Sequence, residues 1–127
     1  MIEILTKRSD FLAANKGLRN ARPGFVLLTR PNEGRGMRYG ITVTKKIGNA
    51  VVRNRMKRRF RELLRAALPE QGLPDHDHVL IGRAGGVERD FQQMAKELHH
   101  VLAAARAGQS DPGRGRRPRR GDKAAAT

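Results

Sequence analysis

The 127-residue sequence contains no cysteine and no tryptophan, and four phenylalanines and one tyrosine are its only aromatic residues. Without cysteine there is no disulfide, thiol nucleophile or cysteine-ligated zinc site. The scarcity of aromatics predicts a small core built mainly from Leu, Val and Ile, enough for one domain. No hydrophobic run approaches the roughly 20 apolar residues of a membrane span, and the first residues do not resemble a secretory signal. We therefore expect a cytoplasmic protein.

Acidic residues are also scarce, with 12 Asp and Glu against 27 Lys and Arg and a formal net charge of +15. A polyanion is the natural partner of such a chain, and nucleic acid comes ahead of an anionic membrane surface. The few acids are scattered along the sequence, whereas a protein-only nuclease needs a carboxylate cluster that holds magnesium. A nucleic-acid-binding protein is thus favoured over a metal-dependent nuclease.

Residues that could carry covalent or metal chemistry are few. Ser9 and Ser110 are the only serines, and neither stands in a nucleophile motif. The four histidines fit no zinc-ligand spacing; they are His76, His78, His99 and His100. The sequence therefore predicts no catalytic residue and no metal ligand in the protein.

The positive charge is concentrated in residues 45–65, which contain nine basic residues and one acidic residue, Glu62. The basic residues are Lys45, Lys46, Arg53, Arg55, Lys57, Arg58, Arg59, Arg61 and Arg65. A second basic stretch, rich in Gly, Pro and Ala, closes the sequence, and its composition is typical of disorder. We predict one domain over residues 1–106 and a disordered basic tail over residues 107–127.

Hydrophobic spacing predicts an α+β protein. A short helix capped by Thr6 runs to about Lys16, with Gly17 in a left-handed conformation. Strands are expected over residues 24–31, 37–44 and 78–82. Apolar residues at helical spacing predict helices over residues 50–68, ended by Pro69, and from Asp90, which resembles a capping-box residue, onward. Helices then cover one side of a sheet.

A period of two divides the strand residues between two faces of this sheet. One face is packed, and its predicted residues are Phe25, Leu27, Tyr39, Ile41 and Val43. The other face is open, and its predicted residues are Val26, Leu28, Arg30, Gly40, Thr42 and Thr44. The open face is available for a ligand.

The helix predicted over residues 50–68 has a row of basic side chains on one side with no acidic side chain between them. Arg53, Lys57 and Arg61 follow one another at intervals of four, a spacing at which like charges repel by a few tenths of a kcal/mol. A row of bound phosphates would offset that repulsion. The simpler interpretation of these cations is a solvated charged face that binds nothing. Gly48 and Asn49 before the helix allow two readings, a phosphate site at its N-terminus or an ordinary turn with an Asn cap.

The segment KKIGNAVVRNRMKRRFRE, residues 45–62, resembles the signature of the bacterial ribonuclease P protein family, whose Arg-Asn-Arg core is Arg53, Asn54 and Arg55 here. The resemblance also includes KRSDF, GFVLLTRP and YGITVTKK and extends over roughly residues 5–106. It implies a two-layer sandwich with the order αβββαβα and a mixed four-stranded sheet, in which Leu18 to Ala21 supply the additional strand. It also implies a left-handed crossover through the basic helix, although handedness rules favour the right-handed one.

The resemblance further implies the protein subunit of ribonuclease P, a ribonucleoprotein endoribonuclease. In that family the protein binds the catalytic RNA and the 5′ leader of precursor tRNA, and promotes Mg-dependent 5′ maturation. Catalysis belongs to the RNA, which also holds most of the magnesium, and the protein has no tightly bound cofactor. The rival reading is a basic RNA-binding protein unconnected with tRNA maturation, which would show no preference for leader-bearing tRNA.

Carried over by position, the resemblance assigns two RNA-binding surfaces. The residues expected to contact the catalytic RNA are Lys45, Lys46, Arg53, Asn54, Arg55, Arg58 and Arg59. Lys57 and Arg61 could serve either surface. The residues expected at the leader are Phe11, Thr42 and Thr44, with Lys7, Arg8, Leu28 and Arg30. Some relatives have further aromatics where this chain has Asn15 and Leu28, so we expect weaker stacking here; Phe11 itself could equally be a core residue.

Overall fold

Five strands and three α-helices make up residues 2–111, the part of the chain that this computed structural model describes. In chain order they are β1 (Glu3–Ile4), α1 (Arg8–Ala14), β2 (Leu18–Arg22), β3 (Phe25–Pro31), β4 (Arg38–Thr42), α2 (Ala50–Gln71), β5 (His76–Gly82) and α3 (Phe91–Arg106). Two short 3₁₀ helices precede α2 and α3; they are η1 (Lys45–Ile47) and η2 (Ala84–Gly86).

The strands form one mixed sheet with the order β1-β4-β5-β3-β2. β3 pairs antiparallel with β2 and β5, whereas β4 pairs parallel with β5 and β1. The predicted α+β class and mixed sheet are confirmed, and β2 is the additional strand expected near Leu18. The predicted count of four strands is short by β1, a two-residue strand that pairs with Arg38 and Tyr39. Two residues are too few to produce a recognisable sequence pattern.

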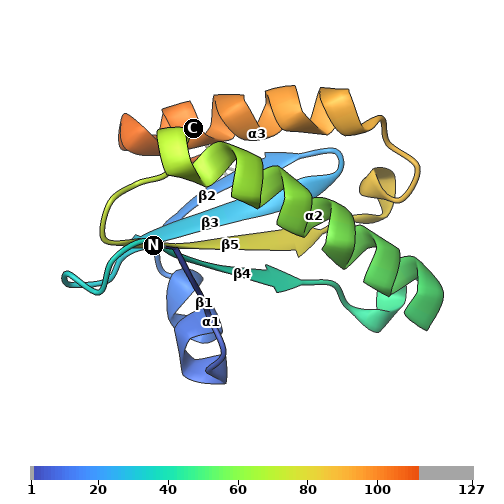
Figure 1. Cartoon of the computed structure of the whole chain (residues 1–127), viewed down its shortest axis with the longest axis horizontal. Coiled ribbons are helices and arrows are strands. Elements are labelled where there is room, and N and C mark those ends of the chain that lie inside the picture. The colour runs from blue at the N-terminus through green and yellow to red at the C-terminus, as the bar shows by residue number, and fades with distance from the viewer. Residues whose placement is uncertain (1, 112–127) are drawn as a thin grey trace, which may run out of the picture.

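The connection from β4 through α2 to β5 is a left-handed crossover. In Figure 1, β4 and β5 both point right, β5 lies above β4, and α2 passes in front of the sheet. A right-handed connection would place β5 below β4 in this view. The hand that the family resemblance implies is therefore present.

Helices α2 and α3 cover the face of the sheet that holds the main core (Figure 1). Phe25, Leu27, Tyr39 and Val43 are buried there, as the strand period predicts, and Ile41 packs against them with partial exposure. The helices contribute Met56, Phe60, Leu63, Leu64, Leu68, Met94, Leu98, Val101 and Leu102. The predicted packed face of β3 and β4 is thus confirmed.

The opposite face of the sheet is only partly open. Val26 and Leu28 do point away from the main core, but they are 5% and 3% exposed. With Val79, Leu5 and Ala14 they form a second cluster beneath α1. The sequence predicted an open face here because it did not show that α1 covers this face. This helix is only seven residues long, too short to show a clear amphipathic pattern.

The limits of α1 differ from the prediction. Lys7 is the N-cap and makes no side-chain capping bond, so Thr6 is not the cap, and the helix ends at Ala14. Gly17 is not in the left-handed region. A Cβ on Gly17 would lie 1.9 Å from the carbonyl oxygen of Thr29, so this glycine permits a close approach of two backbones.

Helix α2 continues through Pro69, which was predicted to end it, as far as Gln71. Proline has no N–H, so it leaves the carbonyl four residues earlier, that of Arg65, without its helical hydrogen bond. Arg65 is exposed, and water can solvate this carbonyl. Gly72 closes the helix by donating its N–H to the Leu68 carbonyl at 2.9 Å.

Contacts with the sheet extend past the predicted domain boundary at residue 106. The Ser110 Oγ accepts a hydrogen bond from the Arg19 N–H at 2.9 Å, and the Asp111 carboxylate accepts one from the Ala21 N–H at 2.6 Å. The Asp111 N–H donates to the Arg19 carbonyl at 2.7 Å. Residues 109–111 therefore line the outer edge of β2, whereas residues 112–127 of the predicted tail lie outside the described residues.

Candidate nucleic-acid interface

The N-terminus of α2 joins two cations on η1 to the basic helix. The Asn49 side chain caps α2 by accepting a hydrogen bond from the Val52 N–H at 3.0 Å, which confirms the capping reading of Asn49. Arg53 Nε donates to the Gly48 carbonyl at 3.2 Å and ties the helix to the preceding turn. Lys45 and Lys46 are exposed on that turn. They are thereby fixed relative to the cations of α2.

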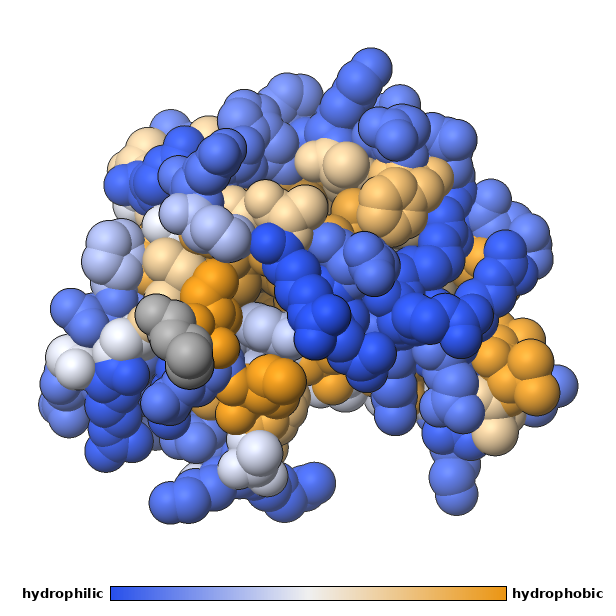
Figure 2. Space-filling view, in the orientation of Figure 1, coloured by the Kyte–Doolittle hydropathy of each residue, from blue (hydrophilic) through white to orange (hydrophobic). Residues whose placement is uncertain are grey.

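The outer face of α2 carries exposed side chains that point away from the core: Asn54, Arg55, Arg58 and Arg65. Figure 2 shows hydrophilic side chains gathered over this helix. Arg55 lies 3.7 Å from the Glu88 carboxylate, but both side chains are more than half exposed, so this ion pair stabilises the free protein little. These side chains remain available to a polyanion.

Arg59 is directed elsewhere, although the family resemblance placed it among the RNA contacts. Its guanidinium donates hydrogen bonds to the carbonyls of Gly86, Val87 and Arg89, and it lies 5.9 Å from the centre of the Phe91 ring. These partners lie about 30 residues along the chain, so the sequence gives no sign of them. Arg59 ties the loop between β5 and α3 to the basic helix.

We predict that Arg59→Ala lowers the free energy of unfolding by about 1–3 kcal/mol, because it leaves several carbonyls without their charged donor. Urea unfolding measures this. Arg58→Ala removes the same charge from an exposed position and is expected to change stability by less than about 0.5 kcal/mol. Equal stabilities for the two variants would contradict the structural role of Arg59.

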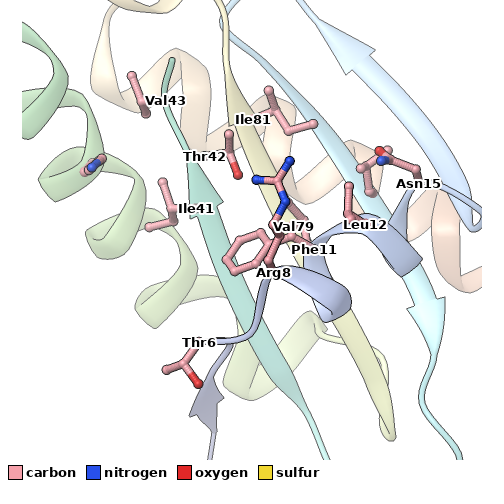
Figure 3. Close-up of a pocket in the computed structure, with 12 residues that line it drawn as sticks. Thr6, Arg8, Phe11, Leu12, Asn15, Ile41, Thr42, Val43, Val79 and Ile81 are labelled. Atoms are coloured by element: carbon pink, nitrogen blue, oxygen red, sulfur yellow. The ribbon is translucent and has the colours of Figure 1, made fainter. Parts of the chain in front are cut away.

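A cleft of about 540 Å³ lies between α1, the second face of the sheet and the flank of α2 (Figure 3). Its lining residues are Thr6, Arg8, Phe11, Leu12, Asn15, Leu28, Ile41, Thr42, Val43, Lys57, Val79 and Ile81. The cleft extends round the edge of β4, which β1 covers only at Arg38 and Tyr39. It combines an aromatic ring, two threonine hydroxyls and two cations over an apolar floor.

The cleft brings together four of the seven residues predicted at the leader: Arg8, Phe11, Leu28 and Thr42. Lys7 and Thr44 are exposed beside helix N-termini and do not line it. Arg30 lines a neighbouring polar hollow with Arg35 and Arg38. The structure therefore places a compact subset of the predicted residues around one cavity.

Lys57, which the sequence could not assign, lines this cleft. At 100° per residue Arg61 follows Lys57 on the same flank of α2, whereas Arg59 faces the other flank and Arg58 lies between them. One helix thus presents cations both to the cleft and to the outer surface.

Sequence reasoning missed several lining residues. Val79 and Ile81 belong to the wholly apolar run of β5, in which nothing distinguishes one face from the other. Ile41 and Val43 were expected only in the packed layer, and they reach the cleft because β4 is exposed at its edge there. Leu12 of α1, 52% exposed, also lines the cleft.

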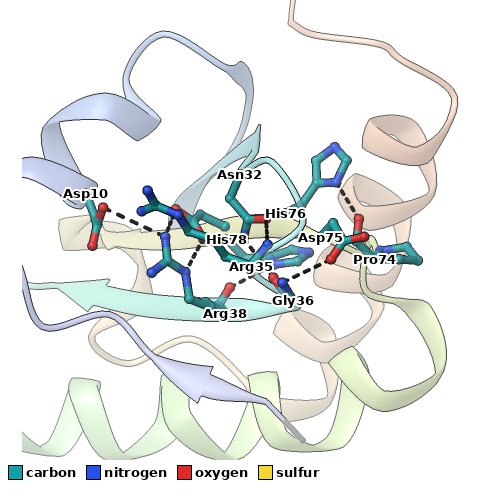
Figure 4. A network of polar contacts seen from close by, with 10 residues as sticks. Asp10, Asn32, Arg35, Gly36, Arg38, Pro74, Asp75, His76 and His78 are labelled. Carbon is teal, nitrogen blue, oxygen red and sulfur yellow. Dashed lines mark hydrogen bonds and ion pairs between the residues drawn. The ribbon is translucent and has the colours of Figure 1, made fainter.

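A polar network beside the cleft fixes α1 and the β3–β4 turn (Figure 4). Arg38 donates two hydrogen bonds to Asp77, at 2.7 and 2.8 Å, and lies 3.7 Å from Asp10 of α1. The Asn32 side chain donates to Asp77 at 2.9 Å and to the Gly36 carbonyl at 2.7 Å. Burial acts to raise the pKa of Asp77, but the hydrogen bonds from Arg38 and Asn32 outweigh burial and hold that pKa below its usual value.

His78 is fully buried next to this network. Its Nε2 accepts a hydrogen bond from the Leu73 N–H at 3.0 Å, so Nδ1 carries the proton and donates to the Arg38 carbonyl at 3.0 Å. Burial lowers the pKa of His78, and the nearby His76 adds to this effect. The folded protein therefore holds His78 neutral.

We predict that the free energy of unfolding falls between pH 7 and about 5.5. The unfolded chain takes up a proton at His78 near pH 6.5, whereas the folded chain resists it, so acid favours the unfolded state by up to about 1.4 kcal/mol per pH unit. Urea unfolding across this range measures the slope. His78→Gln should flatten the slope; an unchanged slope in His78→Gln would refute the prediction.

Within residues 2–111, no group of three or more His, Asp or Glu side chains gathers as metal ligands would. Also within these residues, every helix is too short or too polar to span a lipid bilayer.

Comparison with known proteins decides the family. Residues 2–106 match the family Ribonuclease P. The chain belongs to this family. The ribonuclease P protein component of Erythrobacter litoralis is 70% identical over 114 residues, which are 90% of this chain and 94% of that protein. The ribonuclease P proteins of Staphylococcus aureus and Thermotoga maritima have similar structures. Their TM-scores are 0.69 and 0.68 at 35% and 32% identity, covering 80% and 77% of this chain and 94% and 93% of theirs.

Membership of the ribonuclease P protein family confirms the resemblance seen in residues 45–62. It assigns the chain to RNA binding and tRNA processing, within an endoribonuclease complex that also contains an RNA subunit. The basic face of α2 and the cleft are accordingly candidate RNA-binding surfaces.

Proposed function

We propose that this protein holds two RNAs at once, the catalytic RNA on the outer face of α2 and the 5′ leader of precursor tRNA in the cleft. The observation that carries the proposal is the cleft itself. An aromatic ring, two threonine hydroxyls and two cations surround a cavity of about 540 Å³ that the core does not fill. By tethering the leader, the protein would promote Mg-dependent endonucleolytic maturation of the tRNA 5′ end.

The lining of the cleft suits a single strand of varied sequence. Every base has a face that can stack on Phe11, and such stacking contributes about 1–3 kcal/mol per base. Arg8 of α1 and Lys57 of α2 would neutralise the phosphates that flank the base, and the Thr42 hydroxyl can donate to or accept from a base edge or a 2′-hydroxyl. None of these contacts requires one particular base.

The outer face of α2 suits a folded RNA. Lys45, Lys46, Arg55 and Arg58 are exposed together, with Asn54 between them. Arginine pairs with phosphate oxygens through two parallel hydrogen bonds, and each neutralised phosphate releases counterions. Arg53 would contribute from the first turn of the helix, where it also steadies the Gly48 turn.

The proposal assigns the cleavage step to the RNA subunit and its magnesium ions. The chain has no cysteine, and its two serines stand outside nucleophile motifs. In two-metal hydrolysis the metal ions activate water and stabilise the leaving oxygen, which requires no protein side chain. The protein's part is to raise the affinity for substrate and, by neutralising phosphates, to lower the magnesium concentration that the RNA requires.

The test is cleavage of a precursor tRNA by a bacterial ribonuclease P RNA at low magnesium concentration. We expect little cleavage by the RNA alone, strong stimulation on addition of the protein, and none by the protein alone. Stimulation that is equal for substrates with long leaders and with one-nucleotide leaders would refute the leader assignment. Cleavage by the protein alone would refute the assignment of catalysis to RNA.

A further inference from the structure

Phe11, whose ring lines the cleft, packs directly against a glycine of the sheet. A Cβ on Gly40 of β4 would lie 2.5 Å from Phe11 Cε1 and 2.6 Å from Cζ. It would also lie 3.2 Å from the Leu5 Cβ. Separations below 3.0 Å are essentially never observed for a Cβ, so the ring rests on bare backbone in space that any other residue would occupy.

Backbone conformation does not explain this glycine. Gly40 lies inside β4 and pairs with Val79 of β5, and its φ is not positive. Other residues adopt such a conformation freely, and glycine in a strand interior weakens the strand. A close packing contact remains as the reason for glycine, and the contact observed here is with Phe11.

Helix α1 cannot easily retreat to accommodate a larger residue. Ala14 is fully buried against the sheet. One turn nearer the N-terminus of α1, Asp10 lies 3.7 Å from Arg38, whose guanidinium is held by two hydrogen bonds to Asp77. A side chain at position 40 would therefore displace the Phe11 ring, which borders the free space of the cleft (Figure 3).

We propose that Gly40 is a positioning residue for leader binding: its missing side chain sets how deep the Phe11 ring lies, and so where a base can stack. The inference rests on the proposed leader cleft. With alanine at position 40 the ring is pushed into the space that the base would occupy. Gly40 itself need not touch the RNA.

The test compares affinities of the reconstituted holoenzyme for precursor and mature tRNA. Gly40→Ala is expected to lower the precursor-to-mature ratio roughly tenfold, within the range that loss of one stacked base gives. In a Phe11→Leu background, which lacks the ring, Gly40→Ala is expected to cause no further loss. A loss of stability alone would lower the two affinities together and leave the precursor-to-mature ratio unchanged.

Gly82→Ala is the matched control. A Cβ on Gly82 of β5 would lie 2.5 Å from Met56 Sδ, in the main core on the opposite face of the sheet. This variant should lower the melting temperature and leave the precursor-to-mature ratio at the wild-type value. If Gly40→Ala alone does not fold, Phe11→Leu in the same chain is expected to restore folding, and failure to restore it would overturn the contact.

Two results separate this inference from the function on which it rests. If Phe11→Leu lowers the ratio but Gly40→Ala does not, or if Gly40→Ala acts equally with and without the ring, the role of Gly40 is overturned and the leader cleft stands. If Phe11→Leu keeps the wild-type ratio, the leader cleft fails and the role of Gly40 fails with it.

Discussion

Replacing Arg55 and Arg58 together by alanine is expected to weaken binding of the catalytic RNA roughly 100-fold at moderate salt. Both guanidinium groups are exposed on the outer face of α2, and the ion pair of Arg55 with Glu88 is exposed and weak, so each can reach a phosphate. A hydrogen bond to a charged group contributes about 1.5–3 kcal/mol, or at least about tenfold in affinity. The slope of log K against log salt concentration should also fall by about one unit for each lost contact.

Filter binding or fluorescence titration at several salt concentrations measures both quantities. Lys16→Ala with Lys96→Ala is the matched control, because it removes two exposed cations that lie outside α2. This control should change the salt slope little. If both pairs of substitutions lower the affinity and the slope equally, only overall charge matters and the outer face of α2 is not the binding surface.

Replacing Phe11 by alanine is expected to lower affinity for precursor tRNA by about 5- to 150-fold, the equivalent of 1–3 kcal/mol of stacking. Affinity for mature tRNA, which has no leader, should stay within about twofold. The physical reason is that the ring borders the cleft while its other side packs on Gly40. Equal losses of affinity for both tRNAs would refute the assignment of the leader to the cleft.

Phe11→Ala also removes packing beneath α1, so folding and binding must be separated. Phe11→Leu keeps most of the apolar volume against the sheet and lacks the ring face. We expect it to keep a melting temperature near that of the wild type and to show most of the loss in precursor affinity. A precursor affinity that follows the melting temperature across both variants would mean that Phe11 is a core residue only.

The elements most accurately predicted from the sequence are those with long local patterns. Met56, Phe60, Leu63 and Leu64 repeat at helical spacing and are all buried in α2. The alternation of Tyr39 to Val43 placed the faces of β4 correctly. In both cases the pattern arises from burial along a single element, which the spacing of apolar residues records directly.

Features that depend on distant parts of the chain could not be predicted. The Arg59 side chain is bound by carbonyls from residues 86–89, and a basic residue in a basic helix carries no sign of such partners. Likewise, Lys57 lines the cleft because α1 and β4 approach α2 in space. The family resemblance supplied the two surfaces, and only tertiary structure assigns Lys57 to one of them.

The hydrogen bonds between residues 109–111 and β2 bear on how the protein behaves at high concentration. An uncovered outer strand offers free N–H and C=O groups on which a strand of another molecule can add. Here the N–H groups of Arg19 and Ala21 already have partners from Ser110 and Asp111 of the same chain. The outer edge of β2 is thus less able to pair with a strand of another molecule. The residues that protect it lie beyond α3, the last helix.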